Sequence, residues 1–395
     1  MSLGSAGKPQ QGRATTPTNT AAWIGGKYAQ LQVGPAPYTS PGEDQIVVRN
    51  HAVAINPLDW IIQVAGPVAY RWLTYPTVIG SDIAGEVVEV GKAVTRFRVG
   101  DRVLGHAVGT DKDSNRAAEG AFQEYTVVLE RLASPIPDTL SYASACVLPL
   151  TLSTAACGLF QADHLALRHP SANAARTGRT VLIWGGSTSV GSNAIQLAVA
   201  AGYDVITTAS PRNFTHVTSL GASQVFDYHS PTVVADIIAA FQGKTLAGAL
   251  AIGTGSAEAC ADVVRGCTGR KFVSIASTPV SFAGLAAEHR GRFALPQLLA
   301  QLVSANVSLQ LRTRPRGIGT KFIFGTSLKA NEVSTAIYRD FLPAALAQGR
   351  YLAAPEPSVV GHGLSDVQHA LDIQRKGVSA QKIVVSLVPA AASDA

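Results

Sequence analysis

Charged residues are scarce in this sequence. Asp, Glu, Lys and Arg make up only 15% of its 395 residues, whereas hydrophobic residues make up 47%. This balance argues against a disordered chain or a coiled coil and is typical of an α/β protein with buried parallel strands. The chain is longer than one hydrophobic core usually supports, so we expect two or three domains.

Cysteine is scarce too, and no C-x-x-C pair occurs among the four cysteines, Cys146, Cys157, Cys260 and Cys267. Neither a disulfide framework nor a zinc ribbon is therefore predicted, and we expect four buried thiols in a reducing, cytoplasmic compartment. No hydrophobic run predicts a membrane span. Residues 1–20, rich in Ser, Thr, Gly, Pro and Gln, indicate a disordered tail and not a signal peptide.

Positive charge exceeds negative charge by only +6. A local basic cluster is formed by Arg312, Arg314, Arg316 and Lys321. Aromatic residues do not alternate with it, so nucleic acid is not an expected partner, and a solvated loop is the default interpretation. An acidic carrier or an anionic arm of the substrate is the alternative.

The pattern of the chain changes near residue 141. Before it, short alternating strands with Gly/Pro turns predict a small, mostly antiparallel, barrel-like domain at 21–150. The clearest of these strands are Gln45–Ile55, Val78–Val90, Arg98–Leu104 and Phe122–Val128.

After that point helices and strands alternate, beginning with a helix near Tyr142–Phe160. The alternation predicts a doubly wound parallel sheet in an α/β domain at 151–330, with Phe322–Gly325 as its last strand. A helix near 331–348 leads away from that sheet. Residues 331–395 end in a helix near Leu364–Lys376 and a strand at Lys382–Val388, and we expect them to rejoin the first domain.

The segment Ile183–Ala198 joins a buried strand to a helix through a glycine-rich turn. Gly185 and Gly186 permit close backbone approach, Gly191 lets the helix lie on the sheet, and free N–H groups at a helix start attract an anion. A dinucleotide pyrophosphate is the expected occupant, and a turn without a ligand is the alternative. The predicted cofactor-binding residues of this turn are Gly185, Gly186, Ser187, Thr188, Ser189 and Val190.

The end of the second strand, Asp204–Thr208, predicts which dinucleotide binds. No carboxylate follows Thr208 to accept a ribose 2′-OH. Ser210 can cap the next helix without any ligand. Arg212, however, stands in the first helical turn, where a cation is disfavoured unless an anion lies beside it. A 2′-phosphate would be that anion, so the predicted cofactor is NADPH.

Three motifs carry a family resemblance: Ala54–Asp59, Ile79–Val87 and Val99–Val103. With the order of the parts, they resemble the medium-chain dehydrogenase/reductase superfamily over about residues 21–390. This implies a GroES-like barrel as catalytic domain and a Rossmann sheet for NADP. Gly185–Gly191 and Ala209–Phe214 resemble the zinc-independent branch of quinone oxidoreductases and enoyl reductases, above all the trans-acting enoyl reductases of microbial and fungal polyketide pathways.

Zinc enzymes of that superfamily carry a Cys at the position of Asn56 and a His-Glu pair at Ser81-Asp82, and Leu150 falls near the third ligand. An amide, a hydroxyl and an alkyl chain cannot supply the zinc ligands. The sequence therefore predicts no metal.

The resemblance also implies the site residues. Asn56 would lie near the nicotinamide and donate to a substrate carbonyl, with Thr151 lining the pocket and Tyr70 or Tyr75 as wall or proton donor. Water is the other proton source, and the Thr151 hydroxyl can serve its helix instead. Three further predicted cofactor residues are Asp59, Asn213 and Tyr228. Asp59 can equally cap a turn or helix, and Tyr228 can be a packing residue.

The expected function is NADPH-dependent, zinc-independent reduction of a conjugated C=C in a small-molecule or carrier-bound acyl substrate. At the position of Ile61, enoyl reductases of this branch often carry a lysine, so the sequence departs from the branch there. The alternatives are a quinone or aldehyde reductase with NADPH and a non-catalytic NADPH-binding sensor. We expect a monomer or homodimer with no nucleic-acid or membrane partner.

Overall fold

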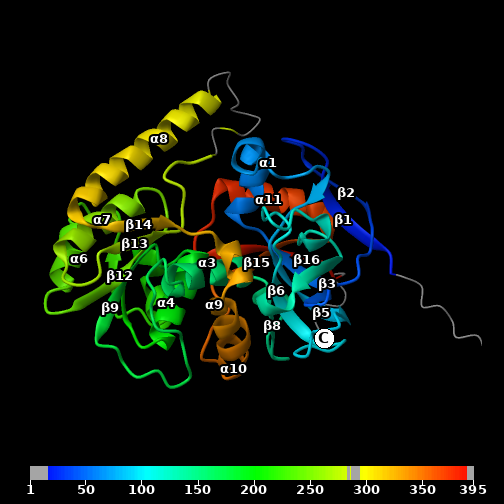
Figure 1. The fold of residues 1–395 in the computed structure, drawn as a ribbon, viewed down its shortest axis with the longest axis horizontal. Helices are drawn as coiled ribbons and strands as arrows, with labels where there is room; N and C mark the ends of the chain where they lie inside the picture. Colours follow the sequence, from blue (N-terminus) through cyan, green and yellow to red (C-terminus); the bar gives the residue numbers. More distant parts are fainter. Residues whose placement is uncertain (1–16, 283–284, 286–293, 389–395) are drawn as a thin grey trace, which may run out of the picture.

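The computed structural model describes residues 17–282, 285 and 294–388. Two domains lie side by side, a β-rich domain built mainly from the first third of the chain and a parallel-sheet domain built from its middle (Figure 1). Most of the predicted N-terminal tail and residues 389–395 lie outside the described residues, although the first strand already begins at Asn19.

The β-rich domain contains two sheets. The smaller has the order β2-β1-β4, and the larger has the order β15-β16-β3-β5-β6-β8, with β7 paired to β3. All of these pairs are antiparallel except β15 with β16. The strands are β1 (Asn19–Ile24), β2 (Leu31–Ala36), β3 (Gln45–Ala54), β4 (Thr77–Val78), β5 (Asp82–Val90), β6 (Arg102–His106), β7 (Tyr125–Leu129), β8 (Ala133–Pro135), β15 (Glu356–His362) and β16 (Gln381–Ser386). Helices α1 (Pro57–Ala69) and α11 (Val367–Lys376) pack together beside them.

The second domain is a six-stranded, all-parallel sheet with the order β11-β10-β9-β12-β13-β14. Its strands are β9 (Arg179–Trp184), β10 (Asp204–Ala209), β11 (Gln224–Asp227), β12 (Thr245–Ala251), β13 (Phe272–Ile275) and β14 (Gly319–Phe322). Its helices are α4 (Ser189–Ala200), α5 (Phe214–Ser219), α6 (Val233–Ala240), α7 (Ser256–Gly266) and α8 (Ala294–Thr313). The chain reverses its direction of travel across the sheet between β9 and β12, and ligands of such sheets bind at the carboxyl ends of strands at this reversal. The predicted α/β fold class is confirmed.

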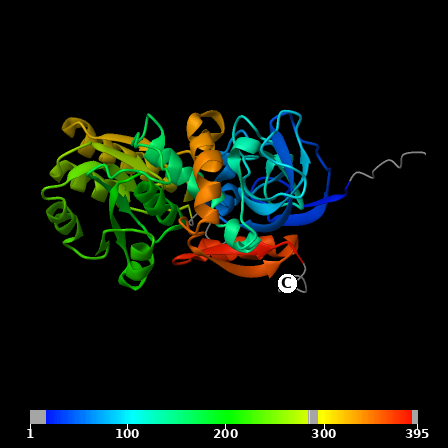
Figure 2. The ribbon, with the colours of Figure 1, turned by 90° about the horizontal axis from the view of Figure 1, so that it is seen from below.

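The two domains meet around buried helices. Helix α3 (Pro149–Phe160) contacts both α4 and β6, and the helical segment that includes α9 (Glu332–Ser334) and α10 (Leu342–Ala347) stands between the domains (Figure 2). The stretch Tyr142–Phe160 is long and apolar enough to cross a membrane by composition, but 78% of its most apolar window is buried inside the fold. It is thus accounted for as the core helix of this fold.

Several element boundaries differ from the sequence expectation. The expected strand Val78–Val90 divides into β4 and β5, because Gly80 between them has a φ of +95°. The expected helix Tyr142–Phe160 divides into α2 (Tyr142–Ala145) and α3, which starts with a proline. The last parallel strand, β14, ends where the expected strand begins.

Helix α8 is an element that the sequence pattern did not predict. Its apolar side chains are spread around the helix: Leu298 is buried, while Leu299, Val303 and Leu311 are exposed. The helical period of 3.6 residues is hidden by this distribution. The basic cluster is consequently not a loop, because Arg312 lies in the last turn of α8 and Lys321 in β14.

All four cysteines are free and buried, as expected. Burial raises the pKa of the Cys157 thiol to about 12, so this group stays an unreactive thiol at neutral pH.

Candidate active site

The glycine-rich turn follows β9 at the reversal point of the parallel sheet. Gly185 has a φ of +86°, a conformation that L side chains rarely adopt. A Cβ on Gly191 would lie 2.2 Å from the Gly185 carbonyl oxygen, so only glycine lets α4 start this close to the strand. Thr188 caps α4, its hydroxyl oxygen accepting a hydrogen bond from the Gly191 N–H at 3.0 Å.

The backbone N–H groups of the turn divide into two sets. Those of Gly185 and Gly186 donate to Thr208 in the neighbouring strand, to its hydroxyl at 3.0 Å and its carbonyl at 2.8 Å. Within the described part of the chain, no acceptor takes the N–H groups of Ser187, Ser189 or Val190. These three donors stand at the N-terminus of a 12-residue helix, and unpaired N–H groups at such a place can bind an anion such as phosphate.

The end of β10 brings the predicted specificity residues into reach of this turn. Ser210 precedes a 3-10 turn at Pro211–Asn213, and the exposed Arg212 side chain makes no hydrogen bond or ion pair with any described residue. Asn213 is buried, and its amide donates to the hydroxyls of Ser210 at 3.3 Å and Ser379 at 3.2 Å. Ser379 comes from the segment before β16, so this contact joins the two domains.

Tyr228 follows β11 and is 44% exposed, with its ring 4.0 Å from that of His229. The sequence placed no carboxylate after β10, but the register pairs Ala209 of β10 with Asp227 of β11. The Asp227 side chain accepts hydrogen bonds from the His229 backbone N–H at 3.0 Å and interacts with its ring at 3.1 Å. Local contacts therefore already use Oδ1 of this carboxylate.

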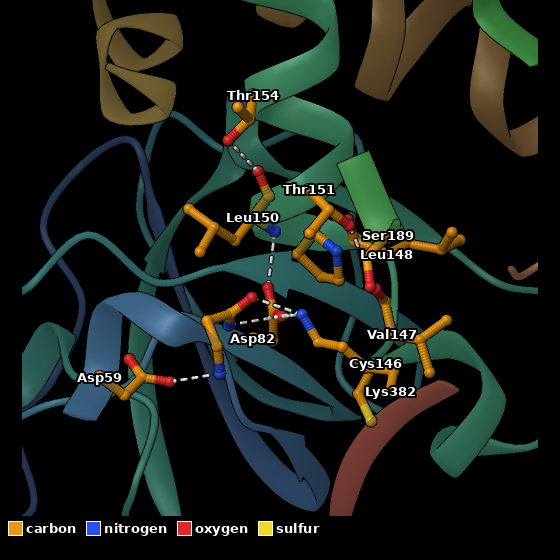
Figure 3. Close-up of polar contacts among 12 residues, drawn as sticks. Asp59, Asp82, Cys146, Val147, Leu148, Leu150, Thr151, Thr154, Ser189 and Lys382 are labelled. Atoms are coloured by element: carbon orange, nitrogen blue, oxygen red, sulfur yellow. Dashed lines mark hydrogen bonds and ion pairs between the residues drawn. The ribbon is translucent and has the colours of Figure 1, made fainter. Parts of the chain in front are cut away.

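A chain of hydrogen bonds leads from the turn to the β-rich domain. The Asn193 side-chain amide donates to the Ser189 carbonyl at 2.8 Å and to the Thr151 hydroxyl at 3.1 Å. The preceding residue of α3, Leu150, donates its backbone N–H to Asp82 Oδ1 at 2.6 Å. Figure 3 shows Ser189, Thr151, Leu150 and Asp82 gathered around the start of α3. The structure thus brings the predicted turn and the predicted catalytic segment together.

Asn56 lies at the N-terminus of α1, and two charged groups hold its side-chain amide. Its Nδ2 donates to Asp82 Oδ2 at 2.8 Å, and its Oδ1 accepts from the ammonium group of Lys382. The ammonium group is also 2.9 Å from Asp82 Oδ2. Asn56 is 1% exposed, Asp82 0% and Lys382 3%, so this is a buried ion pair with an amide between its charges.

Asp59 holds the backbone of the same residue, because its Oδ2 accepts from the Asn56 N–H at 2.8 Å. Its other oxygen, Oδ1, is buried and has no hydrogen-bond partner among the described residues. Burial raises the pKa of Asp59 to about 7, against the opposing effect of the Asn56 hydrogen bond. The capping interpretation of Asp59 therefore has a direct contact in the structure, whereas its predicted role toward a cofactor stays a prediction.

The other two predicted catalytic residues lie in different surroundings. The Thr151 hydroxyl donates to the Leu148 carbonyl at 3.0 Å and accepts from Asn193, so its hydrogen serves its own helix. Tyr70 ends α1 and packs on Trp72. Burial, with smaller effects of Asp59 and Asp111, raises the pKa of the Tyr70 hydroxyl, so this hydroxyl keeps its proton at neutral pH.

A second buried polar row crosses the domain boundary beside this site. His106 Nδ1 lies 2.9 Å from the Ser153 hydroxyl, which lies 2.8 Å from the Tyr338 hydroxyl, and Tyr338 donates to the Pro149 carbonyl at 2.9 Å. Burial lowers the pKa of His106 to about 4, so its ring is neutral at pH 7. The row fixes α3 between the domains.

The sequence reasoning missed Lys382 and Asn193. Lys382 is a lone cation at the start of an apolar strand, and Asn193 is an amide inside an apolar helical pattern. Each was a visible polar exception in a buried element, and such exceptions need a partner. The identity of those partners was hidden, because they lie 326 and 42 residues away.

Comparisons with known proteins give consistent results. The family model of the alcohol dehydrogenase GroES-like domain matches residues 42–138. The chain is 54% identical over 373 residues to a protein of Monascus ruber named dehydrogenase pigH, covering 94% of this chain and 100% of that one. It is 38% identical over 375 residues to a trans-enoyl reductase of Aspergillus japonicus, himH, with 93% and 97% covered.

Two further comparisons concern metal and fold. A protein of Emericella nidulans, cipB, is named a zinc-binding alcohol dehydrogenase domain-containing protein and is 45% identical over 371 residues, with 93% of this chain and 98% of that one covered. A crystal structure of an alcohol dehydrogenase superfamily protein from Novosphingobium aromaticivorans superimposes with a TM-score of 0.69 at 25% identity, covering 94% of this chain and 100% of that one.

Proposed function

The chain belongs to the medium-chain dehydrogenase/reductase superfamily and is an oxidoreductase, and we propose that it reduces a conjugated C=C with NADPH and without zinc. The expected substrate is an enoyl thioester, carried by a protein or free, or an enone. The observation that carries the proposal is the single site formed by the turn, the start of α3 and the buried Asn56 group.

The chain offers NADPH a fitting place. Three N–H donors at the start of α4 have no acceptor among the described residues and suit the pyrophosphate, and a Cβ at Gly191 would collide with the turn at Gly185. Arg212 is exposed and without an ion-pair partner among the described residues, as an arginine that meets a 2′-phosphate must be. Ser210, Asn213 and Tyr228 line the same strand ends, and their contacts with the ribose and its phosphate are part of the proposal.

Zinc does not fit the residues at the corresponding place. Tetrahedral zinc needs Cys, His or carboxylate ligands, and Asp82 is the one such side chain among Asn56, Ser81, Asp82 and Leu150. Both oxygens of Asp82 are already used, by Leu150 and by the Asn56 and Lys382 side chains. Among the residues that the structure describes, no three His, Cys, Asp or Glu side chains form a group that could hold a metal.

NADPH supplies a hydride when it is bound. Reduction at the β-carbon places negative charge on the substrate's carbonyl oxygen, which needs a hydrogen-bond donor. Asn56 Nδ2 gives one hydrogen to Asp82 and has a second that can serve this oxygen. The α-carbon then takes a proton, for which Tyr70 or water is the source, and the product is the saturated thioester or ketone.

An acceptor panel tests the proposal. Purified protein is mixed with NADPH or NADH and, in separate reactions, with an enoyl thioester, an enone, a quinone or an aldehyde. Cofactor oxidation is followed as the loss of absorbance of the reduced nicotinamide. We expect turnover with NADPH and the conjugated C=C compounds. Faster turnover of the quinone or aldehyde would show that the proposed substrate class is wrong. Tight NADPH binding without turnover of any acceptor would indicate a sensor.

Two further parts of the proposal are the cellular location of the protein and its independence of zinc. We place the protein in the cytoplasm, where NADPH is available and where its four free thiols stay reduced. Mass spectrometry of the purified protein for metal content is the direct test of zinc independence. One equivalent of zinc bound by side chains would contradict it.

A further inference from the structure

Lys382 carries the one cation in the buried group around Asn56. It enters on β16, from the C-terminal end of the chain, and its ammonium group contacts Asp82 Oδ2 at 2.9 Å as well as Asn56 Oδ1. Figure 3 shows Lys382 and Asp82 meeting below the start of α3, with Asp59 on the other side of Asp82 in this view. No described residue of the turn or of the β10 end contacts this ammonium group.

Burying such a pair brings little stability. Removing two charges from water is costly, and well-packed apolar residues of similar size often stabilise a fold as much or more. A buried ion pair that breaks the apolar pattern of a strand is more typical of a functional site than of a core. The question is therefore what the ammonium group does to the groups that it contacts.

Its effect on Asn56 follows from hydrogen-bond chemistry. A side-chain amide has an oxygen that only accepts and a nitrogen that only donates. The ammonium group can only donate, so it binds Oδ1, and the Asp82 carboxylate can only accept, so it binds Nδ2. Together they exclude the flipped amide, in which two donors and two acceptors would face each other.

The fixed orientation matters for the reduction. With Oδ1 on Lys382 and one Nδ2 hydrogen on Asp82, the second Nδ2 hydrogen has no acceptor among the described residues, and the donor is further polarised because its amide oxygen is bound to a cation. If the amide flipped, an oxygen would face the developing negative charge of the substrate. Asn56 also stands at a position where, by resemblance, zinc members of the superfamily carry a ligand, and Asp82 directly follows another such position, Ser81.

We infer that Lys382 is a positioning residue for the reduction: held by Asp82, its ammonium group fixes the Asn56 amide as a hydrogen-bond donor. This inference depends on the proposed role of Asn56. It does not depend on whether the acceptor is a C=C, a quinone or an aldehyde, because each places negative charge on oxygen.

The kinetic test is a double-mutant cycle on the acceptor that the native protein reduces fastest. The variants are Asn56→Ala, the pair Asp82→Asn with Lys382→Met, and all three changes together. The pair removes both charges at once, so no unpaired buried charge is left to unfold the protein. Lys382→Arg, which keeps the cation, is the conservative control, and thermal unfolding confirms that each variant folds.

We expect Asn56→Ala to lower kcat about 100-fold, as loss of one oxyanion donor does. The Asp82/Lys382 pair should lower kcat about 10- to 100-fold with the KM for NADPH within about twofold, a loss expected from misplacing a reacting group. In the Asn56→Ala background the pair should change kcat less than about threefold. Lys382→Arg, which keeps the cation, should retain more activity than the Asp82→Asn/Lys382→Met variant.

A second readout does not require turnover. In NMR spectra of protein labelled with 15N-asparagine, the signals of the two Asn56 side-chain amide hydrogens are identified by their loss in Asn56→Ala. These hydrogens should exchange slowly with water in the native protein and quickly in the Asp82→Asn/Lys382→Met variant. Full kcat in the folded pair variant, an equal loss with and without Asn56, or an unchanged Asn56 amide signal would each overturn the inference. If the native protein reduces no acceptor, the proposed function fails and the amide signal alone decides the role of Lys382.

Discussion

The carboxyl group of Asp59 should make this protein less stable as the pH rises from acid to neutral. Its side chain is 0% exposed and one oxygen lacks a partner among the described residues. Burial raises its pKa from 3.8 to about 7. Above pH 4 the unfolded chain releases this proton, while the folded protein holds it until about pH 7.

The magnitude follows from this difference in pKa. With about 1.36 kcal/mol for each pH unit between the two pKa values, the free energy of unfolding falls by at most about 4 kcal/mol between pH 4 and pH 7. The unfolded state binds fewer protons than the folded state across this range, so the slope is negative. Above pH 7 both states are ionised, and the contribution of Asp59 becomes constant.

Asp59→Asn should remove this slope. The amide oxygen can still accept the Asn56 N–H, and the side chain resembles the protonated acid in shape but cannot ionise. We therefore expect the variant to have nearly native stability at pH 4 and to exceed the native protein by up to about 4 kcal/mol at pH 8.

Urea unfolding at pH 4 to 9 followed by tryptophan fluorescence measures this effect. The signal reports mainly the β-rich domain, because three of the four tryptophans, Trp23, Trp60 and Trp72, lie there. Asp101→Asn is the matched control: Asp101 also accepts a backbone N–H three residues earlier at 2.8 Å, but at an exposed turn. Parallel stability curves for native protein and Asp59→Asn would refute the reasoning, as would lower stability of Asp59→Asn at pH 8.

Three further predictions concern the cofactor end and the domain boundary. Arg212→Glu should weaken NADPH binding at least about 10-fold and leave NADH binding unchanged, measured by calorimetry with Arg314→Glu as charge control; an unchanged preference contradicts the assignment. Gly191→Ala, whose Cβ would lie 2.2 Å from a backbone oxygen, should abolish binding of both cofactors, whereas Gly26→Ala, with nothing within 4 Å, should not. Tyr338→Phe should lower the free energy of unfolding by about 1 to 3 kcal/mol in urea titrations, because a fully buried hydroxyl with two partners is lost; native stability would show that the row is not structural.

Those parts of the protein whose causes are local could be predicted from its sequence. The glycine-rich turn could be predicted because the backbone conformation at Gly185 and the close approach of helix and strand at Gly191 both require glycine. The alternation of strands and helices likewise indicated the parallel sheet. The oxidoreductase family followed from short motifs, and the absence of a carboxylate after Thr208 followed from reading one strand end.

The boundaries of helices and strands, and elements without a periodic hydrophobic pattern, were harder to predict from the sequence. Helix α8 escaped prediction because its apolar residues face several directions, and β14 was placed too late along the chain. Tertiary contacts override weak local preferences at such places.

The construction of the candidate active site depends on how the whole chain folds. Lys382 meets Asn56 across 326 residues, and Tyr351 donates to Asn193 across 158. No local pattern contains such a pairing, because it results from the strand order and from the packing of α3 between two domains. The sequence thus determined which chemistry the backbone turn could hold, and the fold decided which charges stand around Asn56, since electrostatic contacts depend on distance in space and not along the chain.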